Sequence, residues 1–192
     1  MRLYLASESP RRKELLKELA DEFTVEGADV EEISSKSGLA PAAVAMVNAR
    51  MKAAAVALKH PEDWIVAADT IVELAGNVYG KPRDLVHAAE MLREFSGKAH
   101  KVITAVVVCC CIENKRSEFT AETTVRFRNL SEQDIACYLS QVPVLDKAGS
   151  YGIQEKGEIL VESIEGELTN VIGLPVKALT CEMEKLGILG KF

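Results

Sequence analysis

The feature that most constrains the fold is the run of residues 102–112, which is apolar except for Thr104 and rich in β-branched side chains. Such side chains favour extended backbone, so the run predicts a long strand. It is too short to cross a bilayer as a helix. A second apolar run, residues 64–68, continues as strand over residues 71–74, and residues 123–127 are expected to pair antiparallel with the long strand.

Helices are predicted between these strands. Ser9-Pro10 opens one, with serine as the N-cap and proline at the first helical position, and residues 42–59 form a longer one rich in alanine. Hairpins intervene, which predicts an α/β fold with a mixed central sheet flanked by helices. Residues 159–164 are expected as a further strand. The 192 residues suit a single two-lobed domain, with residues 97–144 as the second lobe.

Composition argues against several classes of partner. The net charge is −6, whereas proteins that bind nucleic acid or membrane surfaces normally present a basic face, so we expect neither partner. The apolar start, residues 1–6, is too short for a signal peptide. The five cysteines include no CxxC pair, which favours a reducing compartment and a cytoplasmic protein. We interpret Cys109-Cys110-Cys111 as strand residues rather than as a metal or redox site.

The turn at residues 5–12 predicts a phosphate-binding site. A strand runs into a loop that carries Ser7, and the helix that follows has Arg11 and Arg12 in its first turn. Free backbone N–H groups, the positive end of the helix and paired guanidinium groups all favour an anion. The alternative interpretation is a solvated basic helix start.

Three further residues stand out in or beside apolar segments. Asp69 comes at the end of the buried run 64–68, where α/β sheets place ligands, and it can act as general base, metal ligand or turn former. Lys81 is held between a glycine and a proline, which indicates a phosphate contact or a fixed surface charge. Lys52 is isolated among alanine, valine and methionine on its helix, although an exposed lysine is the common case.

Two loops complete the candidate site. Residues 146–154 are rich in glycine, and Gln154 offers both a donor and an acceptor to the edge of a nucleobase; a solvated turn is the alternative. Asp29, Glu31 and Glu32 form an acidic loop that suits Mg²⁺, which one or two carboxylates hold together with substrate phosphates. A solvated acidic loop is an equally good interpretation.

Taken together, these segments resemble the Maf family of nucleotide pyrophosphatases, in order from Leu5 to Pro175. The matching segments are Ala6-Ser7-Glu8-Ser9-Pro10-Arg11-Arg12, Ala49-Arg50-Met51-Lys52-Ala53, Ala68-Asp69-Thr70-Ile71-Val72, Gly80-Lys81-Pro82, Ser96-Gly97-Lys98-Ala99-His100-Lys101-Val102-Ile103-Thr104-Ala105, residues 146–154 and Asn170-Val171-Ile172-Gly173-Leu174-Pro175. Two departures occur: Asn48 replaces the usual leucine, and Glu31-Glu32-Ile33 stands where Asp-Glu-Thr is common.

The resemblance implies a fold related to inosine-triphosphate pyrophosphatases, a divalent metal such as Mg²⁺ or Mn²⁺, and a homodimer. It also implies hydrolysis of a nucleoside triphosphate to the monophosphate and pyrophosphate, and Tyr151-Gly152-Ile153-Gln154 is similar to the branch that acts on dTTP and UTP. Two alternatives remain: a 7-methyl-GTP or modified-purine pyrophosphatase, and a non-catalytic nucleotide-binding regulator of cell division. Intact Asp69 and Lys81 argue against the regulator.

Roles for individual residues follow from the same resemblance. Asp69 is the expected catalytic acceptor and, with Glu32, a metal ligand. The residues expected to hold the triphosphate are Ser7, Arg12, Lys52 and Lys81. Those expected to set the base preference are Arg11, Thr70 and Gln154.

Overall fold

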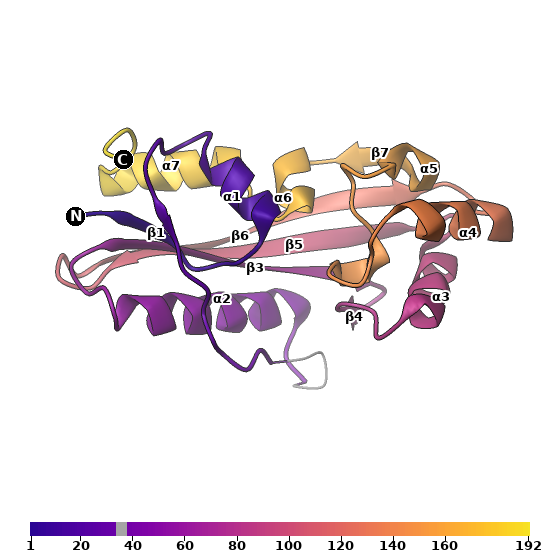
Figure 1. Cartoon of the computed structure of the whole chain (residues 1–192), viewed down its shortest axis with the longest axis horizontal. Coiled ribbons are helices and arrows are strands. Elements are labelled where there is room, and N and C mark those ends of the chain that lie inside the picture. The colour runs from indigo at the N-terminus through magenta and orange to yellow at the C-terminus, as the bar shows by residue number, and fades with distance from the viewer. Residues whose placement is uncertain (34–37) are drawn as a thin grey trace.

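The predicted long strand lies at the centre of the molecule. In a computed structural model, which describes residues 1–33 and 38–192, β5 (Ala99–Cys110) pairs antiparallel with β6 (Lys115–Phe127) along its whole length (Figure 1). The partner strand therefore begins earlier than the predicted residue 123. Its first half includes Lys115, Arg116 and Glu118 and contains no buried residue, so pairing with β5 rather than its own composition makes it a strand.

The sheet is mixed, as predicted. Seven strands are ordered β2-β1-β3-β5-β6-β7, with β4 paired to β3. The remaining strands are β1 (Leu3–Leu5), β2 (Thr24–Val25), β3 (Trp64–Leu74), β4 (Asn77–Tyr79) and β7 (Val161–Glu165). Strand β1 is parallel to β2 and β3, and the other pairs are antiparallel.

Helices cover both faces of the sheet (Figure 1). Helix α2 (Pro41–Ala57) lies on one face, and α1 (Pro10–Leu16), α6 (Leu168–Ile172) and α7 (Val176–Leu186) lie on the other. Helices α3 (Leu85–Phe95), α4 (Glu132–Gln141) and α5 (Gly157–Leu160), with the 3₁₀ turn η2 (Ala148–Ser150), gather at the far end. In the described part of the chain, no helix is long and apolar enough to cross a membrane.

The strand predicted over residues 159–164 is confirmed from residue 161 onward and wrong at its first two residues. Residues up to Leu160 belong to α5, and β7 starts at Val161. Lys156 has a left-handed backbone with φ 59° and turns the chain into α5, whose Gly157 and Leu160 are buried. A short apolar run does not distinguish a buried helical turn from a strand, which explains the error.

Three apolar cores support these layers. One fills the space between α2 and the sheet, and includes Ala49, Ile65 and Val107. A second lies on the opposite face and joins residues of α1 and α7 to β1, β3 and β5. The third, at the far end, packs α3 and α4 against side chains of β3, β5 and β6. The long strands thus run through both halves of the molecule (Figure 1).

Strand β3 has one open stretch, and this feature positions the site. On one edge it pairs with β5 over residues 65–73. On the other edge β1 pairs with residues 64–66 and β4 with residues 72–74, so no described strand pairs with residues 67–71 there. Asp69 lies in the middle of this gap. The prediction that it ends a strand was wrong, because β3 continues past it to Leu74.

Candidate active site

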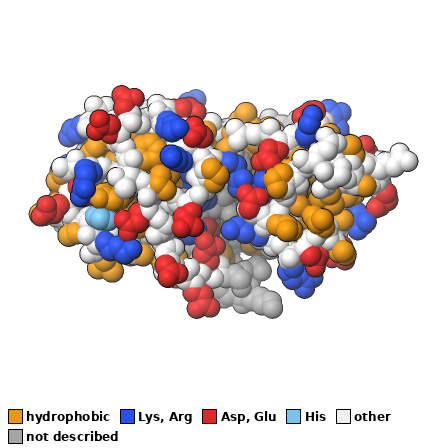
Figure 2. Space-filling model, in the orientation of Figure 1, with side chains coloured by type: hydrophobic (Ala, Val, Ile, Leu, Met, Phe, Trp, Pro, Cys, Tyr) orange, Lys and Arg blue, Asp and Glu red, His pale blue; other side chains and the backbone are white. Residues whose placement is uncertain are grey.

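A cleft of about 840 Å³ opens beside the unpaired stretch of β3. All nine predicted site residues line it: Ser7, Arg11, Arg12, Glu32, Lys52, Asp69, Thr70, Lys81 and Gln154. Acidic and basic side chains gather near the middle of the face shown in Figure 2. The predicted residues therefore converge on one place, although they come from segments scattered through most of the chain.

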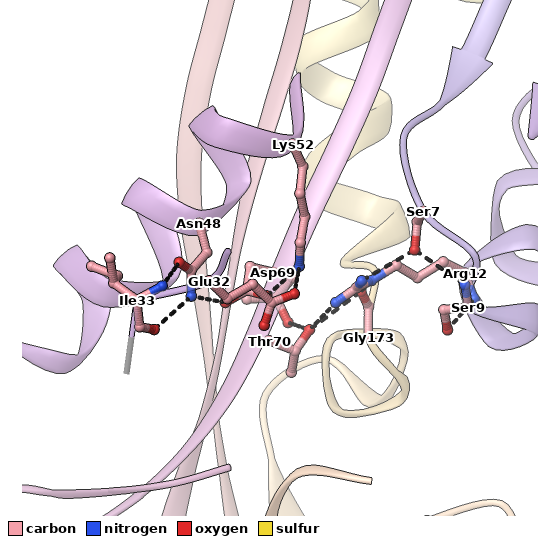
Figure 3. A network of polar contacts seen from close by, with 11 residues as sticks. Ser7, Ser9, Arg12, Glu32, Ile33, Asn48, Lys52, Asp69, Thr70 and Gly173 are labelled. Carbon is pink, nitrogen blue, oxygen red and sulfur yellow. Dashed lines mark hydrogen bonds and ion pairs between the residues drawn. The ribbon is translucent and has the colours of Figure 1, made fainter. Parts of the chain in front are cut away.

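Lys52 links the two candidate acidic residues. Its ammonium group lies 2.6 Å from Asp69 Oδ1 and 2.7 Å from Glu32 Oε1, and Figure 3 shows it reaching from α2 toward β3. Lys52 and Asp69 are both buried, with 9% and 6% of their surface exposed. A buried charge is stable only when it is paired, so the suspicion that Lys52 is not an ordinary surface lysine is confirmed.

The Glu32 carboxylate is half-exposed and ionised. Burial raises its pKa, but the hydrogen bond to Lys52 and the charges of Lys52, Lys81 and Arg12 outweigh burial and lower it overall. Glu32 and Asp69 approach the same ammonium nitrogen, so their oxygens are close enough to share one cation. Carboxylate oxygens suit Mg²⁺ or Mn²⁺, and no group of three or more potential ligands occurs in the part of the chain that the structure describes. Glu32 and Asp69 thus fit a metal that also takes oxygens from its substrate.

Arg12 occupies the other side of the open strand. Alternation along β3 sends Asp69 toward α2 and Thr70 to the opposite face, where Arg12 Nη2 donates to Thr70 Oγ1 at 2.9 Å. The guanidinium also donates to Ser7 Oγ at 3.3 Å and to the carbonyl of Gly173 at 2.8 Å. The cleft therefore wraps around the strand edge and takes side chains from both faces of the sheet (Figure 3).

These contacts leave the positive charge of Arg12 without a direct counter-ion among the described residues, because each partner is a neutral oxygen. Burial lowers its pKa, although Asp69 and Glu32 oppose the effect through space. The local cause is the predicted turn: the Ser9 side chain accepts from Arg12 N and caps α1, and Pro10 occupies its first turn. This placement presents a partly buried guanidinium to an anion in the cleft.

The segment predicted to read a base forms the opposite wall. Gln154 is exposed to the cleft, and Arg11 Nη1 reaches the segment through a 3.0 Å ion pair with Asp146 Oδ2. Lys147 is buried and bonds Asp146 Oδ1 at 2.9 Å and Glu155 Oε1 at 3.2 Å. Burial raises the pKa of Asp146, but hydrogen bonds from Lys147 and Arg11 lower it overall.

Buried aromatic side chains anchor this wall from below. Gly152 N donates to Tyr138 Oη at 2.9 Å, and Tyr151 Oη lies 2.8 Å from His100 Nε2. His100 is itself enclosed by Phe95 and Phe127, and burial lowers its pKa to about 4. The histidine is therefore a neutral structural group.

Sequence reasoning missed two contributors. Asn48 is buried beside Asp69, and its signals were a polar residue one helical turn before Lys52 and a departure from the motif that the chain resembles. Lys147 was quoted only as part of a motif, yet it joins both ends of the loop that carries Gln154. The cysteine interpretation holds for Cys109 and Cys110, which are buried strand residues, whereas Cys111 is exposed just beyond β5.

An α/β fold with a cation-rich cleft around two carboxylates defines a protein that binds a phosphorylated small molecule. The family profile described as Maf-like protein matches residues 2–186, and the chain belongs to this family. A relative from Pyrococcus abyssi is 47% identical over 96% of both chains, and one from Akkermansia muciniphila is 43% identical over 95% of both. Each of these relatives is named dTTP/UTP pyrophosphatase.

A solved structure supports the fold independently. The Ham1 protein of Staphylococcus aureus matches with a TM-score of 0.57 at 18% identity, over 97% of this chain and 100% of that chain. At this identity the likeness concerns the fold alone. It confirms the predicted fold class, a mixed α/β architecture of the Ham1 type.

Proposed function

We propose that this protein hydrolyses dTTP and UTP to the monophosphate and pyrophosphate. The observation that carries the proposal is the convergence of Arg12, Lys52 and Asp69 on one cleft beside the open edge of β3. The cleft volume of about 840 Å³ lies within the range of roughly 300–1,000 Å³ that is usual for small-molecule sites. The names of relatives that align with nearly the whole chain support the same reaction.

The cations are assigned to the triphosphate. Arg12 is partly buried and has no direct counter-ion among the described residues, and its remaining donor capacity suits phosphate oxygens. Lys81 lies exposed on the cleft wall, where its charge is accessible to a ligand. Ser7 adds a hydroxyl that already contacts Arg12. These groups stabilise the charge that develops on the leaving pyrophosphate.

Asp69 is assigned to the attacking water. A bond forms between the water oxygen and the α-phosphorus, the bond to the pyrophosphate oxygen breaks, and the water gives up a proton. Asp69 is placed to orient this water or to accept the proton, and Lys52 holds one of its oxygens. A divalent cation bound by Glu32 and Asp69 would supply additional neutralisation of phosphate charge.

Base recognition is assigned to the wall opposite Asp69. Thymine and uracil present carbonyl acceptors flanking an N–H donor, and the carboxamide of Gln154 can satisfy one of each. Arg11 is tied to the same wall by Asp146, which supports a shared role. Thr70 contacts Arg12 directly. Any effect of Thr70 on base preference therefore acts beside the Arg12 guanidinium.

The deciding experiment is release of pyrophosphate from dTTP, UTP, CTP, GTP and 7-methyl-GTP by the purified protein with Mg²⁺ or Mn²⁺. We expect the highest kcat/KM for dTTP and UTP, and a loss of at least ~100-fold in turnover in Asp69→Asn. A preference for 7-methyl-GTP would support the purine alternative. Nucleotide binding without pyrophosphate release from any substrate would support the regulator.

We further propose a divalent-metal requirement, a homodimer and a cytoplasmic location. The paired carboxylates support the metal, and the free state of all five cysteines suits a reducing compartment. The dimer rests on the family resemblance. Chelation should abolish turnover and added Mn²⁺ should restore it; activity in excess chelator would contradict the metal requirement. Sedimentation should give twice the chain mass, and a monomeric mass would contradict the homodimer.

A further inference from the structure

Asn48 makes a set of contacts that ordinary helix packing does not require. It lies on α2 one turn before Lys52 and is 3% exposed. Its Nδ2 donates to Asp69 Oδ2 at 3.2 Å and to the Ile33 carbonyl at 3.2 Å, while its Oδ1 accepts from Ile33 N at 2.8 Å (Figure 3). One side chain thus binds both backbone groups of a loop residue and a carboxylate on β3.

The partners fix the orientation of this amide. Ile33 N is only a donor, so it must face the oxygen of Asn48, whereas the carboxylate of Asp69 and the carbonyl of Ile33 are acceptors and must face the nitrogen. The opposite orientation would place like groups together at all three contacts. The arrangement is therefore specific to a side chain that carries a donor and an acceptor.

The contacts divide the work between two residues of α2. Lys52 binds Asp69 Oδ1 and the side chain of Glu32, while Asn48 binds Asp69 Oδ2 and the backbone of Ile33, the neighbour of Glu32. Both oxygens of Asp69 are thereby held, and the loop that carries Glu32 is fixed at two points. Glu32 is half-exposed, so packing alone does not define the position of its carboxylate.

We propose that Asn48 is a positioning residue that sets the separation of Glu32 and Asp69, and with it the affinity of the site for a divalent cation. The inference rests on the metal role in the proposed function. Groups that orient metal ligands commonly change metal affinity by about 10- to 100-fold when they are removed. The same change is expected here, because loss of the Asn48 side chain leaves the Glu32 loop held at one point instead of two.

The test uses Asn48→Leu, which keeps the branching and size of the side chain and removes its polar atoms. Leucine is also a strong helix former, so it suits the helix. Hydrogen exchange at the Ile33 amide should become at least ~10-fold faster, and the Mn²⁺ dissociation constant, measured by electron paramagnetic resonance with a non-hydrolysable dTTP analogue, should rise about 10- to 100-fold.

Two further variants test the same step and its specificity. Asn48→Ala removes the same polar atoms without placing apolar bulk beside Asp69, so it should weaken Mn²⁺ binding as Asn48→Leu does. Thr123→Val is a matched control, because Thr123 is buried and its hydroxyl likewise bonds both N and O of one loop residue, Glu167, away from the cleft. This variant should leave Mn²⁺ affinity unchanged.

The outcomes are distinct. Unchanged Mn²⁺ affinity in folded Asn48→Leu overturns the proposal, as does equal weakening in Thr123→Val. Should Asn48→Leu fail to fold, unchanged Mn²⁺ affinity in Asn48→Ala overturns it instead. Exchange and Mn²⁺ binding need no turnover, so a wild-type protein that binds Mn²⁺ and releases no pyrophosphate contradicts the proposed function and leaves the positioning role supported.

Discussion

Replacing Lys52 by methionine should test the central charge arrangement most directly. The substitution keeps most of the aliphatic stem and removes the ammonium that Asp69 and Glu32 share at 2.6 and 2.7 Å. Removing one partner of a buried ion pair costs about 3–5 kcal/mol, because the other charge is left in a poor solvent. The contact to Glu32, whose side chain is 53% exposed, adds only about 0–1 kcal/mol.

Asn48 still donates to Asp69 in this variant, so the lower end is expected, about 3 kcal/mol. In a chain of this size each kcal/mol lowers Tm by about 2–4 °C, which gives a loss of about 6–12 °C. Thermal and urea unfolding of wild type, Lys52→Met, Asp69→Asn and the double variant form a double-mutant cycle. We expect a coupling of about 2–3 kcal/mol between the two sites, since the double variant contains neither charge.

Lys59→Met is the control. Lys59 forms an ion pair of similar length, 2.8 Å, with Glu26, but its side chain is 61% exposed. Its removal should leave the unfolding transition where it is, because water screens such a pair. A coupling below about 1 kcal/mol between Lys52 and Asp69, or an equal loss of Tm in Lys59→Met, would refute the reasoning.

Three other predictions concern the two walls of the cleft and the aromatic cluster below. Arg12→Ala and Lys81→Ala should lower kcat/KM by similar factors for all triphosphates, because phosphates carry no base identity. The expected loss is roughly 10- to 150-fold, since a charge-assisted contact contributes about 1.5–3 kcal/mol. A changed ratio of kcat/KM for dTTP to kcat/KM for GTP, at intact overall rates, would contradict this. Gln154→Ala should reduce the preference for dTTP over CTP by about 5- to 150-fold, as an unpaired buried polar group costs about 1–3 kcal/mol, and full preference in the variant would remove Gln154 from the pocket. His100 has a folded pKa of about 4 against an ordinary value of 6.5, so the unfolded chain binds the extra proton first as pH falls. Its contribution is complete above pH 6.5 and about 3 kcal/mol is lost between pH 6.5 and 4, a loss that urea titrations should find smaller in His100→Gln.

The core strands and the cleft residues were predictable because local signals marked them. The β-branched run predicted β5. Ser9-Pro10 predicted the start of α1 and, with it, the position of Arg12. Lys52 was conspicuous because the rest of its helix offers almost nothing but small apolar side chains. In each case one residue or a short segment carried the information.

The remaining features depend on contacts between distant segments. The gap beside Asp69 exists because β1 pairs with β3 only as far as residue 66 of β3, and β4 pairs with β3 only from residue 72 onward. Neither boundary can be predicted from the residues of β3 alone. Asn48 carries no motif of its own, and its role appears only when Ile33 and Asp69 approach it from two sides. The link from Arg11 to Asp146 joins residues 135 positions apart.

Strand β1 is synthesised before β3, the strand with which it pairs in the finished sheet. Its parallel partner in β3 lies about 60 residues later, which at roughly 5–20 residues per second is a delay of about 3–12 s before pairing is possible. During that time Leu3, Tyr4 and Leu5, all buried in the finished protein, are exposed on the nascent chain. The hairpin of β5 and β6 needs no such wait, since its strands follow one another directly. In nascent chains stalled before residue 64, β3 is therefore missing and β1 should remain accessible to chaperones.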